Sequence, residues 1–204
     1  MIALVDYGLG NLKAFANVYK KLNIPFLIAH DPTDLKKADK IILPGVGAFD
    51  YAMERLNKSG MRETLDELAL GNKVPVLGVC VGMQIMAHSS EEGNLRGLSW
   101  IDGIVKKFDP TVFRHSTRLP HMGWNDVKPL TDDSLLKGLE SEAQFYFLHS
   151  FYFQCNNKKN ILANSEYGCE FAAAVNSGNI YGVQFHPEKS HNWGMLLLKN
   201  FATL

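Results

Sequence analysis

Short, uninterrupted apolar runs alternate with amphipathic helical patterns through the first half of the chain, and this alternation constrains the fold most strongly. The runs lie at residues 2–5, 26–29, 40–43 and 74–79. One helical pattern spans residues 12–22 and a second fits Ala52 to Leu70. Strands that are apolar on both faces need cover on both faces, which the helices between parallel strands provide. The sequence therefore predicts an α/β fold with a mostly parallel sheet and helices on both faces.

The second half of the chain is richer in strand patterns. These are aromatic or apolar and lie at residues 145–148, 151–153, 171–175 and 180–185. Residues 176–179 (Asn-Ser-Gly-Asn) predict a hairpin turn between the last two, and residues 192–201 predict a closing helix. Because no repeat, linker or low-complexity tract interrupts residues 1–204, we expect a single domain with an antiparallel β-rich second half.

Composition excludes several classes of protein. The 21 Lys and Arg residues balance 21 Asp and Glu residues, whereas a nucleic-acid binder normally carries a basic surplus. No apolar run approaches the roughly 20 residues that cross a bilayer. Residues 1–6 predict a strand rather than a signal peptide. Three cysteines without a C-x-x-C pair disfavour a disulfide framework or zinc ribbon, so we expect a cytoplasmic protein with reduced thiols.

A glycine-flanked cysteine carries the strongest chemical signal. Gly78, Cys80 and Gly82 stand where a strand pattern passes into residues 83–87, which suit the start of a helix. The same arrangement with serine is the nucleophile elbow, a turn so tight that its neighbours must lack side chains. Such a turn aims the sulfur at a helix N-terminus, whose field favours thiolate, and lets the Val81 N–H meet developing negative charge. The alternative is that Cys80 is a small buried hydrophobic residue.

A cysteine nucleophile needs a base and a group that orients the base. Among seven histidines, His186 ends a predicted strand and is followed by Pro187 and Glu188. The rigid proline lets both side chains face one side, and ligands collect at the strand ends of α/β sheets. The alternative is a surface turn without a catalytic role. Four other histidines are weaker candidates because they lie in polar surroundings or lack an evident partner: His30, His88, His115 and His191.

Two glycine-containing loops follow predicted strands. The first is Leu43-Pro44-Gly45-Val46-Gly47, whose glycines allow close backbone approach to a ligand and leave N–H groups free to point inward. The alternative is an ordinary strand-to-helix connection, which explains these glycines equally well. Gly8 and Gly10 match the start of a dinucleotide-binding fingerprint, but Lys13 stands where its third glycine belongs. We therefore do not expect a nucleotide site. Cys155 and Cys169 lack glycine neighbours of this kind, and we interpret both as structural.

Taken together, these motifs resemble the class I (triad) glutamine amidotransferases. The resemblance rests on residues 78–84 (GVCVGMQ), 43–47 (LPGVG) and 184–190 (QFHPEKS), and it runs over essentially the whole chain. Residues 120–125 (PHMGWN) and 146–152 (YFLHSFY) are most similar to the glutaminase subunits of imidazole glycerol phosphate synthase in histidine biosynthesis. Paralogous glutaminases that supply ammonia for acetamidino sugars of surface polysaccharides are the alternative, since the triad cannot separate the two.

The resemblance implies a flavodoxin-like fold and a mechanism. Cys80 would attack the side-chain amide of glutamine, His186 would move the protons, and Glu188 would orient His186. Ammonia would leave, and water would hydrolyse the glutamyl thioester to glutamate. The oxyanion donors would be the backbone N–H of Val81 and that of Val46 or Gly47. The residues expected to hold the substrate are Gln84 and the backbone of His149, Ser150 and Phe151.

The family also implies a protein partner. Its glutaminases dock on a synthase, here a cyclase-type subunit in a heterodimer, that receives ammonia through an internal passage. The expected interface residues are Asn11, Pro120, Met122, Trp124 and Lys189, although burial in the core is an alternative for Trp124. We expect no cofactor, metal, nucleic acid or membrane. Two other classes remain open at this point, a cysteine peptidase with a similar triad and a binding module without activity.

Overall fold

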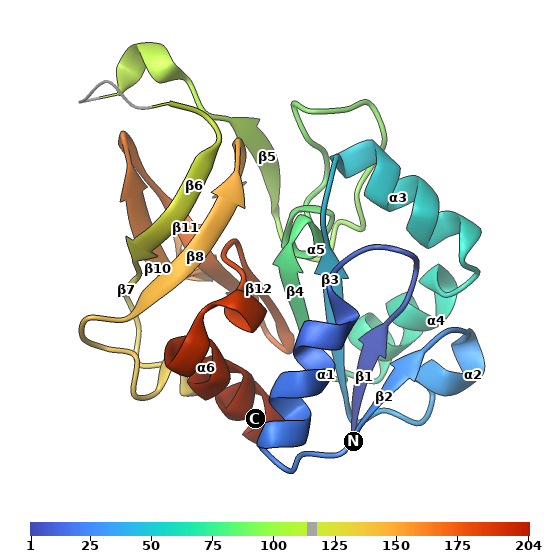
Figure 1. Cartoon of the computed structure of the whole chain (residues 1–204). Helices are drawn as coiled ribbons and strands as arrows, with labels where there is room; N and C mark the ends of the chain where they lie inside the picture. Colours follow the sequence, from blue (N-terminus) through green and yellow to red (C-terminus); the bar gives the residue numbers. More distant parts are fainter. Residues whose placement is uncertain (114–117) are drawn as a thin grey trace.

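The computed structural model describes residues 1–113 and 118–204. His115, one of the weaker histidine candidates, lies outside these residues. Within them, no helix combines the length and the apolar character that a bilayer-spanning segment requires. The two halves predicted from the sequence are both present, and Figure 1 shows them side by side, with the parallel strands and their helices next to an antiparallel, β-rich half.

Five parallel strands form one half of the large sheet. They are β1 (Ile2–Val5), β2 (Phe26–Ala29), β3 (Lys40–Gly45), β4 (Val76–Cys80) and β12 (Ile180–Val183). Their order is β2-β1-β3-β4-β12, and each neighbouring pair is parallel. This is the flavodoxin-like order with its reversal beside β1. The four apolar runs of the first half are thus all strands, and nearly all residues of β1, β3 and β4 are buried.

The connections place helices on both faces of these strands. The crossovers from β1 to β2 and from β2 to β3 run in opposite directions along the sheet, so right-handed connections put α1 and α2 on opposite faces. α6 packs beside α1, and α4 packs beside α2. The helices are α1 (Leu12–Lys21), α2 (Pro32–Leu35), α3 (Phe49–Lys58), α4 (Arg62–Asp66), α5 (Val81–Gln84) and α6 (His191–Thr203).

The single helix predicted from Ala52 to Leu70 is wrong, because α3 and α4 divide this segment. Gly60 adopts φ +73°, a left-handed conformation that interrupts a helix. The Ser59 hydroxyl donates to the Leu56 carbonyl at 2.7 Å and accepts the Met61 N–H at 3.2 Å, which closes the turn. A local serine–glycine stop therefore overrides an apolar spacing that otherwise fits one long helix.

The antiparallel half extends the sheet beyond β12. Its strands are β11 (Cys169–Ser177), β10 (Ile161–Tyr167), β7 (Lys128–Pro129), β9 (Phe151–Cys155) and β5 (Gly103–Lys107). β11 pairs with β12, which confirms the predicted hairpin. A separate two-stranded ribbon consists of β6 (His121–Asp126) and β8 (Gln144–His149). The ribbon is fixed to the large sheet by aromatic packing, since Phe145 of β8 stacks on Phe185 with ring centroids 4.0 Å apart.

Candidate active site

Three neighbouring strands end at one edge of the sheet, each at a motif identified in the sequence. Gly45 of β3 pairs with Cys80 of β4, and Val183 of β12 pairs with Val79. The glycine loop follows β3, and His186 follows β12. Parallel strands present their carboxyl ends at the same edge, which is where ligands bind in open α/β sheets. The topology therefore brings the glycine loop, the cysteine and the histidine together.

Cys80 has the strained backbone of a nucleophile elbow. Its φ of 55° and ψ of −114° lie outside the regions that a residue with a side chain readily adopts. A Cβ on Gly82 would approach the Leu43 carbonyl oxygen to 1.9 Å, and a Cβ on Gly78 would lie 2.7 Å from the Gly82 oxygen. Only glycine fits at these two places. The close packing of the elbow against β3 therefore explains Gly82, and the tightness of the turn itself explains Gly78.

The helix that follows the elbow is shorter than the sequence suggested. α5 spans only Val81–Gln84, a single turn, instead of continuing through residues 83–87. After it the chain turns to pair with a loop, where the Leu98 N–H donates to the Ile85 carbonyl at 2.7 Å. A single turn aligns few peptides, so its field at the sulfur is weaker than that of a long helix, and the predicted stabilisation of thiolate by this field stays a prediction.

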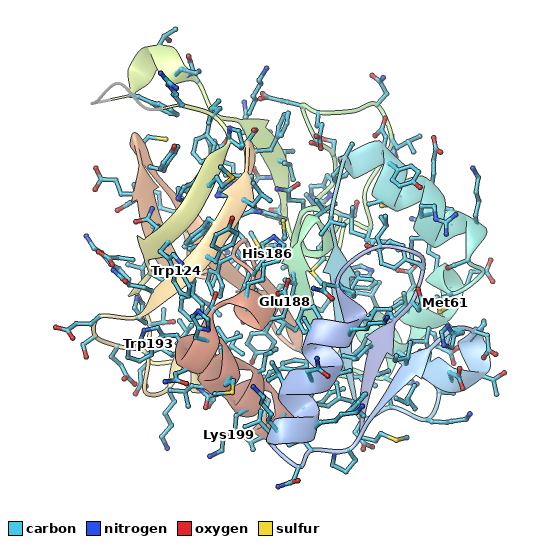
Figure 2. The ribbon with its side chains drawn as sticks, in the orientation of Figure 1. Met61, Trp124, His186, Glu188, Trp193 and Lys199 are labelled. Carbon is cyan, nitrogen blue, oxygen red and sulfur yellow. The ribbon has the colours of Figure 1, made fainter. Side chains whose placement is uncertain are left out.

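His186 and Glu188 form a buried pair beside the elbow. The His186 Nδ1 atom lies 2.9 Å from Glu188 Oε1, and both side chains are almost fully buried. Figure 2 shows the pair near the middle of the molecule, where the two halves meet. A 3₁₀ turn at Pro187–Lys189 directs both side chains inward, as the rigid proline predicted. The sequence motif is thus a buried pair rather than an exposed turn.

The electrostatics of this pair favour a charged imidazole. Burial lowers the pKa of His186, but hydrogen bonds of the ring to Cys80 and Glu188, and the charges of both, outweigh burial and raise it to about 9. Glu188 Oε2 is buried and has no hydrogen-bond partner among the described residues. A buried carboxylate that is only half satisfied depends strongly on its remaining charged neighbour. The arrangement can therefore take up and hold the proton of Cys80.

Ser190 holds the turn that carries the pair. Its hydroxyl donates to the His186 carbonyl at 2.6 Å and accepts the Tyr146 N–H at 3.0 Å, and the His186 N–H donates to the Tyr146 carbonyl at 2.8 Å. Ser190 is fully buried. The three bonds fasten the histidine to β8 of the ribbon. The sequence offered no sign of this role, because Tyr146 lies 44 residues away.

Most of the predicted site residues line one cavity of about 290 Å³ at this edge. Its walls include Val46, Gly47, Cys80, Val81, Gln84, Pro120, His149, Ser150, Phe151, His186 and Lys189. Glu188 is absent from the lining residues because it stands behind His186. The three predicted oxyanion donors thus lie around the sulfur, and their donor roles stay a prediction. Asn11 does not line the cavity, and its side chain caps α1 by accepting the Ala14 N–H.

Two residues of the site were not predicted from the sequence. Glu92 lines the cavity, and its carboxylate accepts the Phe49 N–H at 2.8 Å, so it also fixes the segment after the glycine loop. Tyr7 donates its hydroxyl to the Pro44 carbonyl at 2.6 Å from the end of β1. Burial, and secondly the neighbouring Cys80, raise the pKa of Tyr7. Neither residue belongs to a local motif, and both reach the site across more than 30 residues of sequence.

Gln84, His149 and Phe151 are linked in the cavity wall. The Gln84 amino group donates to the Phe151 carbonyl at 3.2 Å and to Gln184 Oε1 at 3.0 Å, which uses both of its donors. His149 Nδ1 lies 2.8 Å from the same carbonyl, and its Nε2 lies 2.9 Å from His121 Nδ1. The predicted substrate-binding residues are therefore together, but the Phe151 carbonyl is already occupied by protein donors.

The expected interface residues lie on the surface beside the cavity. Met122 is 64% exposed and Trp124 is 46% exposed, so burial of Trp124 in the core is wrong. The Trp124 ring stacks on His191 at 5.3 Å between centroids, and Figure 2 places Trp124 on the ribbon close to the triad pair. Lys189 lies over the ring of Tyr146, 5.6 Å from its centroid. Their contact with a partner stays a prediction.

The His121–His149 pair is held neutral. Burial lowers the pKa of His121 to about 4, and burial lowers that of His149 to about 3 despite its hydrogen bond to Phe151. The unfolded chain would protonate both near the ordinary value of 6.5. Between these values the unfolded state binds more protons than the folded state, so folding becomes less favourable as the pH falls.

We therefore expect the free energy of unfolding to be constant above pH 6.5 with respect to this pair, and to decrease as the pH is lowered from 6.5 toward 4. Urea unfolding at several pH values measures this slope. His121→Phe removes one titrating group while keeping an aromatic ring in the stack, and should flatten the slope. An unchanged slope in His121→Phe would contradict the assignment.

The two other thiols are poorly suited to nucleophilic chemistry. Burial, reinforced by the neighbouring Asp102, raises the pKa of Cys155 to about 12. Burial, reinforced by Glu166, likewise raises the pKa of Cys169. Because the thiolate is the reactive form, neither cysteine supplies a nucleophile near neutral pH. This agrees with the structural role expected from the sequence.

Comparison with known proteins gives one consistent result. The family model described as "Glutamine amidotransferase class-I" matches residues 3–203. The imidazole glycerol phosphate synthase subunit HisH of Bdellovibrio bacteriovorus is 59% identical over 204 residues, covering 100% of both chains. The subunit of the same name from Leptospira borgpetersenii is 53% identical with the same coverage. A glutamine amidotransferase crystal structure has a TM-score of 0.75 at 17% identity, covering 100% of this chain and 99% of that one, and shares the fold. The chain belongs to the class I glutamine amidotransferase family.

Proposed function

We propose that this chain hydrolyses L-glutamine through a thioester on Cys80 and delivers the ammonia to a cyclase-type partner subunit, as part of an imidazole glycerol phosphate synthase in histidine biosynthesis. One observation carries the proposal. A buried His186–Glu188 pair stands beside a strained cysteine in a cavity, in a chain that is 59% identical over its full length to a protein of that name. The protein would act in the cytoplasm, where thiols stay reduced.

The first half of the reaction uses the triad to release ammonia. His186 takes the Cys80 proton, and Glu188 stabilises the resulting imidazolium. The sulfur attacks the amide carbon, forming the C–S bond, and the carbonyl oxygen gains negative charge opposite the N–H groups of Val81 and of Val46 or Gly47. The C–N bond then breaks as His186 returns the proton to the leaving nitrogen. Ammonia departs and a glutamyl thioester remains.

The second half restores the enzyme. Water enters the position left by ammonia, gives a proton to His186 and attacks the thioester carbon through a second oxyanion. The C–S bond breaks, glutamate is formed, and Cys80 recovers its proton from the imidazolium. The same donors serve both oxyanions, so one set of N–H groups suffices for both steps.

Charge in the cavity suits an amino-acid substrate. Glutamine is a zwitterion, and the Glu92 carboxylate in the cavity wall is complementary to its ammonium group. With its amino group engaged by Phe151 and Gln184, Gln84 keeps only its carbonyl oxygen for a ligand, which suits the amide N–H of glutamine. A peptidase would need an open groove for a chain on both sides of the scissile bond. A cavity of about 290 Å³ fits a single amino acid better.

The partner surface is proposed around Met122, Trp124, Pro120, Lys189 and Asn11. Large apolar side chains that remain exposed beside a reaction site indicate a protein interface. Met122 and Trp124 are exposed on the ribbon, while Pro120 and Lys189 belong to both the cavity wall and the surface. A partner seated there would cover the cavity and keep ammonia from water.

The test is glutaminase activity of the purified chain with and without the cyclase-type subunit of the same organism. We expect low activity of the isolated chain and an increase of roughly 5- to 150-fold on adding the partner, the usual range of coupling between sites. Glutamate formation is measured while ammonia transfer is followed as cyclase product. High activity that does not respond to the cyclase, or stimulation only by a sugar-modifying synthetase, would contradict the pathway. Cleavage of peptides without glutamine hydrolysis would contradict the reaction.

A further inference from the structure

Gln184 is a buried polar residue that the reaction described above does not use. It follows β12, two residues before His186, and its side chain is fully buried. Its Nε2 atom lies 3.7 Å from Cys80 Sγ, within hydrogen-bond range for sulfur. Buried amides are normally satisfied by protein partners, and either the oxygen or the amino group of this amide could face the sulfur.

Neighbouring groups fix the direction of the Gln184 amide. The Phe151 carbonyl can only accept, so the end of the Gln84 amide that meets it must be the amino group. The same amino group meets Gln184 at 3.0 Å, which requires the oxygen of Gln184 on that side. The Gln184 amino group therefore faces Cys80. This assignment follows from hydrogen-bonding capacity alone and does not depend on telling nitrogen from oxygen by position.

The far end of the network holds the Phe151 carbonyl in place. Since that carbonyl only accepts, His149 must donate from Nδ1, which leaves its Nε2 to accept from His121 Nδ1. His121 Nε2 then accepts from the Asn125 amide at 3.2 Å. Every member has a single consistent donor or acceptor role, with the Phe151 carbonyl accepting from both sides, so the network leaves the Gln184 amide only one orientation.

We infer that Gln184 is a catalytic residue whose amide N–H donates to Cys80 Sγ and stabilises the thiolate. This inference rests on the nucleophilic role proposed for Cys80. When His186 takes the thiol proton, the sulfur becomes anionic and the N–H···S bond becomes charge-assisted. When the sulfur forms the thioester it loses that charge, and the bond weakens. The donor therefore favours the two stages at which the sulfur carries charge, attack and release of the thioester.

The test follows the pH dependence of Cys80 alkylation by iodoacetamide in the full chain, with the Cys80 peptide quantified by mass spectrometry. Gln184→Leu removes the donor, and Gln184→Glu keeps the shape but places an oxygen toward the sulfur. In Gln184→Leu we expect the alkylation rate of Cys80 at neutral pH to fall about tenfold, because the pH profile of alkylation shifts to higher pH. In Gln184→Glu we expect the alkylation rate to fall further. Gln154→Glu, the same change at an exposed site on β9, should match the wild type.

Loosened packing alone would expose the thiol and speed alkylation, so the expected slowing separates donation from a structural effect. A profile in both Gln184 variants equal to that of the wild type would overturn the inference. A second measurement leaves Gln184 unchanged. The NMR signal of its side-chain amide in the wild type should move over the pH range in which Cys80 alkylation rises, and a stationary signal would overturn the inference. Neither readout requires glutamine turnover, so failure of the proposed function is detected separately in the glutaminase assay.

Discussion

Cys80→Ala is expected to lower glutamine turnover by roughly 10⁴- to 10⁶-fold while the protein keeps its fold, in the range found when a covalent nucleophile is removed. The sulfur is the only atom lost, and it faces the cavity rather than the packed core. Alanine retains the Cβ, so it neither relieves nor worsens the strain at φ 55°. Without the sulfur no thioester forms, and the remaining donors cannot replace a covalent step.

The measurement is steady-state glutamate formation in the presence of the partner, with thermal unfolding as the check on folding. Cys155→Ala and Cys169→Ala are matched controls, because burial raises the pKa of both thiols and neither lines the cavity. Their turnover should stay near that of the wild type. Turnover of Cys80→Ala within tenfold of the wild type would contradict a thioester on this residue.

Glu188→Gln is expected to lower turnover by roughly 10³- to 10⁴-fold, by comparison with the loss seen when the orienting carboxylate of a serine-protease triad becomes an amide. The 2.9 Å contact to His186 Nδ1 requires a proton on that nitrogen when the partner is a carboxylate. An amide can donate there instead, which moves the proton to Nε2 and removes the lone pair that accepts from Cys80. The position of the His186 ring is kept, but its proton lies on Nε2 instead of Nδ1.

The pH–rate profile separates this effect from a loss of folding. In the wild type, hydrogen bonds and charges keep the pKa of His186 near 9, so activity should decline only as the pH rises through that value and the imidazolium is lost. Removing the Glu188 charge lowers the pKa of His186, so the alkaline limb should move to lower pH. Glu63→Gln, on the exposed side of α4, is the matched control. If the alkaline limb of Glu188→Gln lies at the same pH as in the wild type and its turnover is normal, the role of Glu188 is contradicted.

The parallel half of the fold was predictable because its signals are local. Each apolar run is short and continuous, and each buried strand needs nothing else to be identified. The triad was predictable for the same reason, since the elbow glycines and the His-Pro-Glu turn each lie within a few residues. The prediction of a single long helix failed because Ser59 and Gly60 form a stop signal only two residues long, whereas the apolar spacing around them fits an uninterrupted helix.

Residues whose roles depend on distant partners were not predictable. Glu92 acts on Phe49, and Ser190 acts on Tyr146, each across more than 40 residues. The direction of the Gln184 amide depends on the Phe151 carbonyl, which the sequence gives no reason to place near β12. The strands β7 and β10 lacked the clean alternation that identifies a strand, and β6 carries its apolar side chains, Met122 and Trp124, on the exposed face. Contacts made by the finished fold, rather than by any segment, define this part of the site.

The alternation of residues between the two faces of β6 limits how this protein can change through evolution. Along β6, residues alternate between its two faces, so that His121 points into the polar network while Met122 and Trp124 point outward. Residues that support the cavity and residues of the proposed docking surface thus alternate along the six residues of β6. Inserting or deleting one residue would exchange the faces and lose both at once. The segment can therefore adapt to a new partner by substitution in place, but not by a change in length.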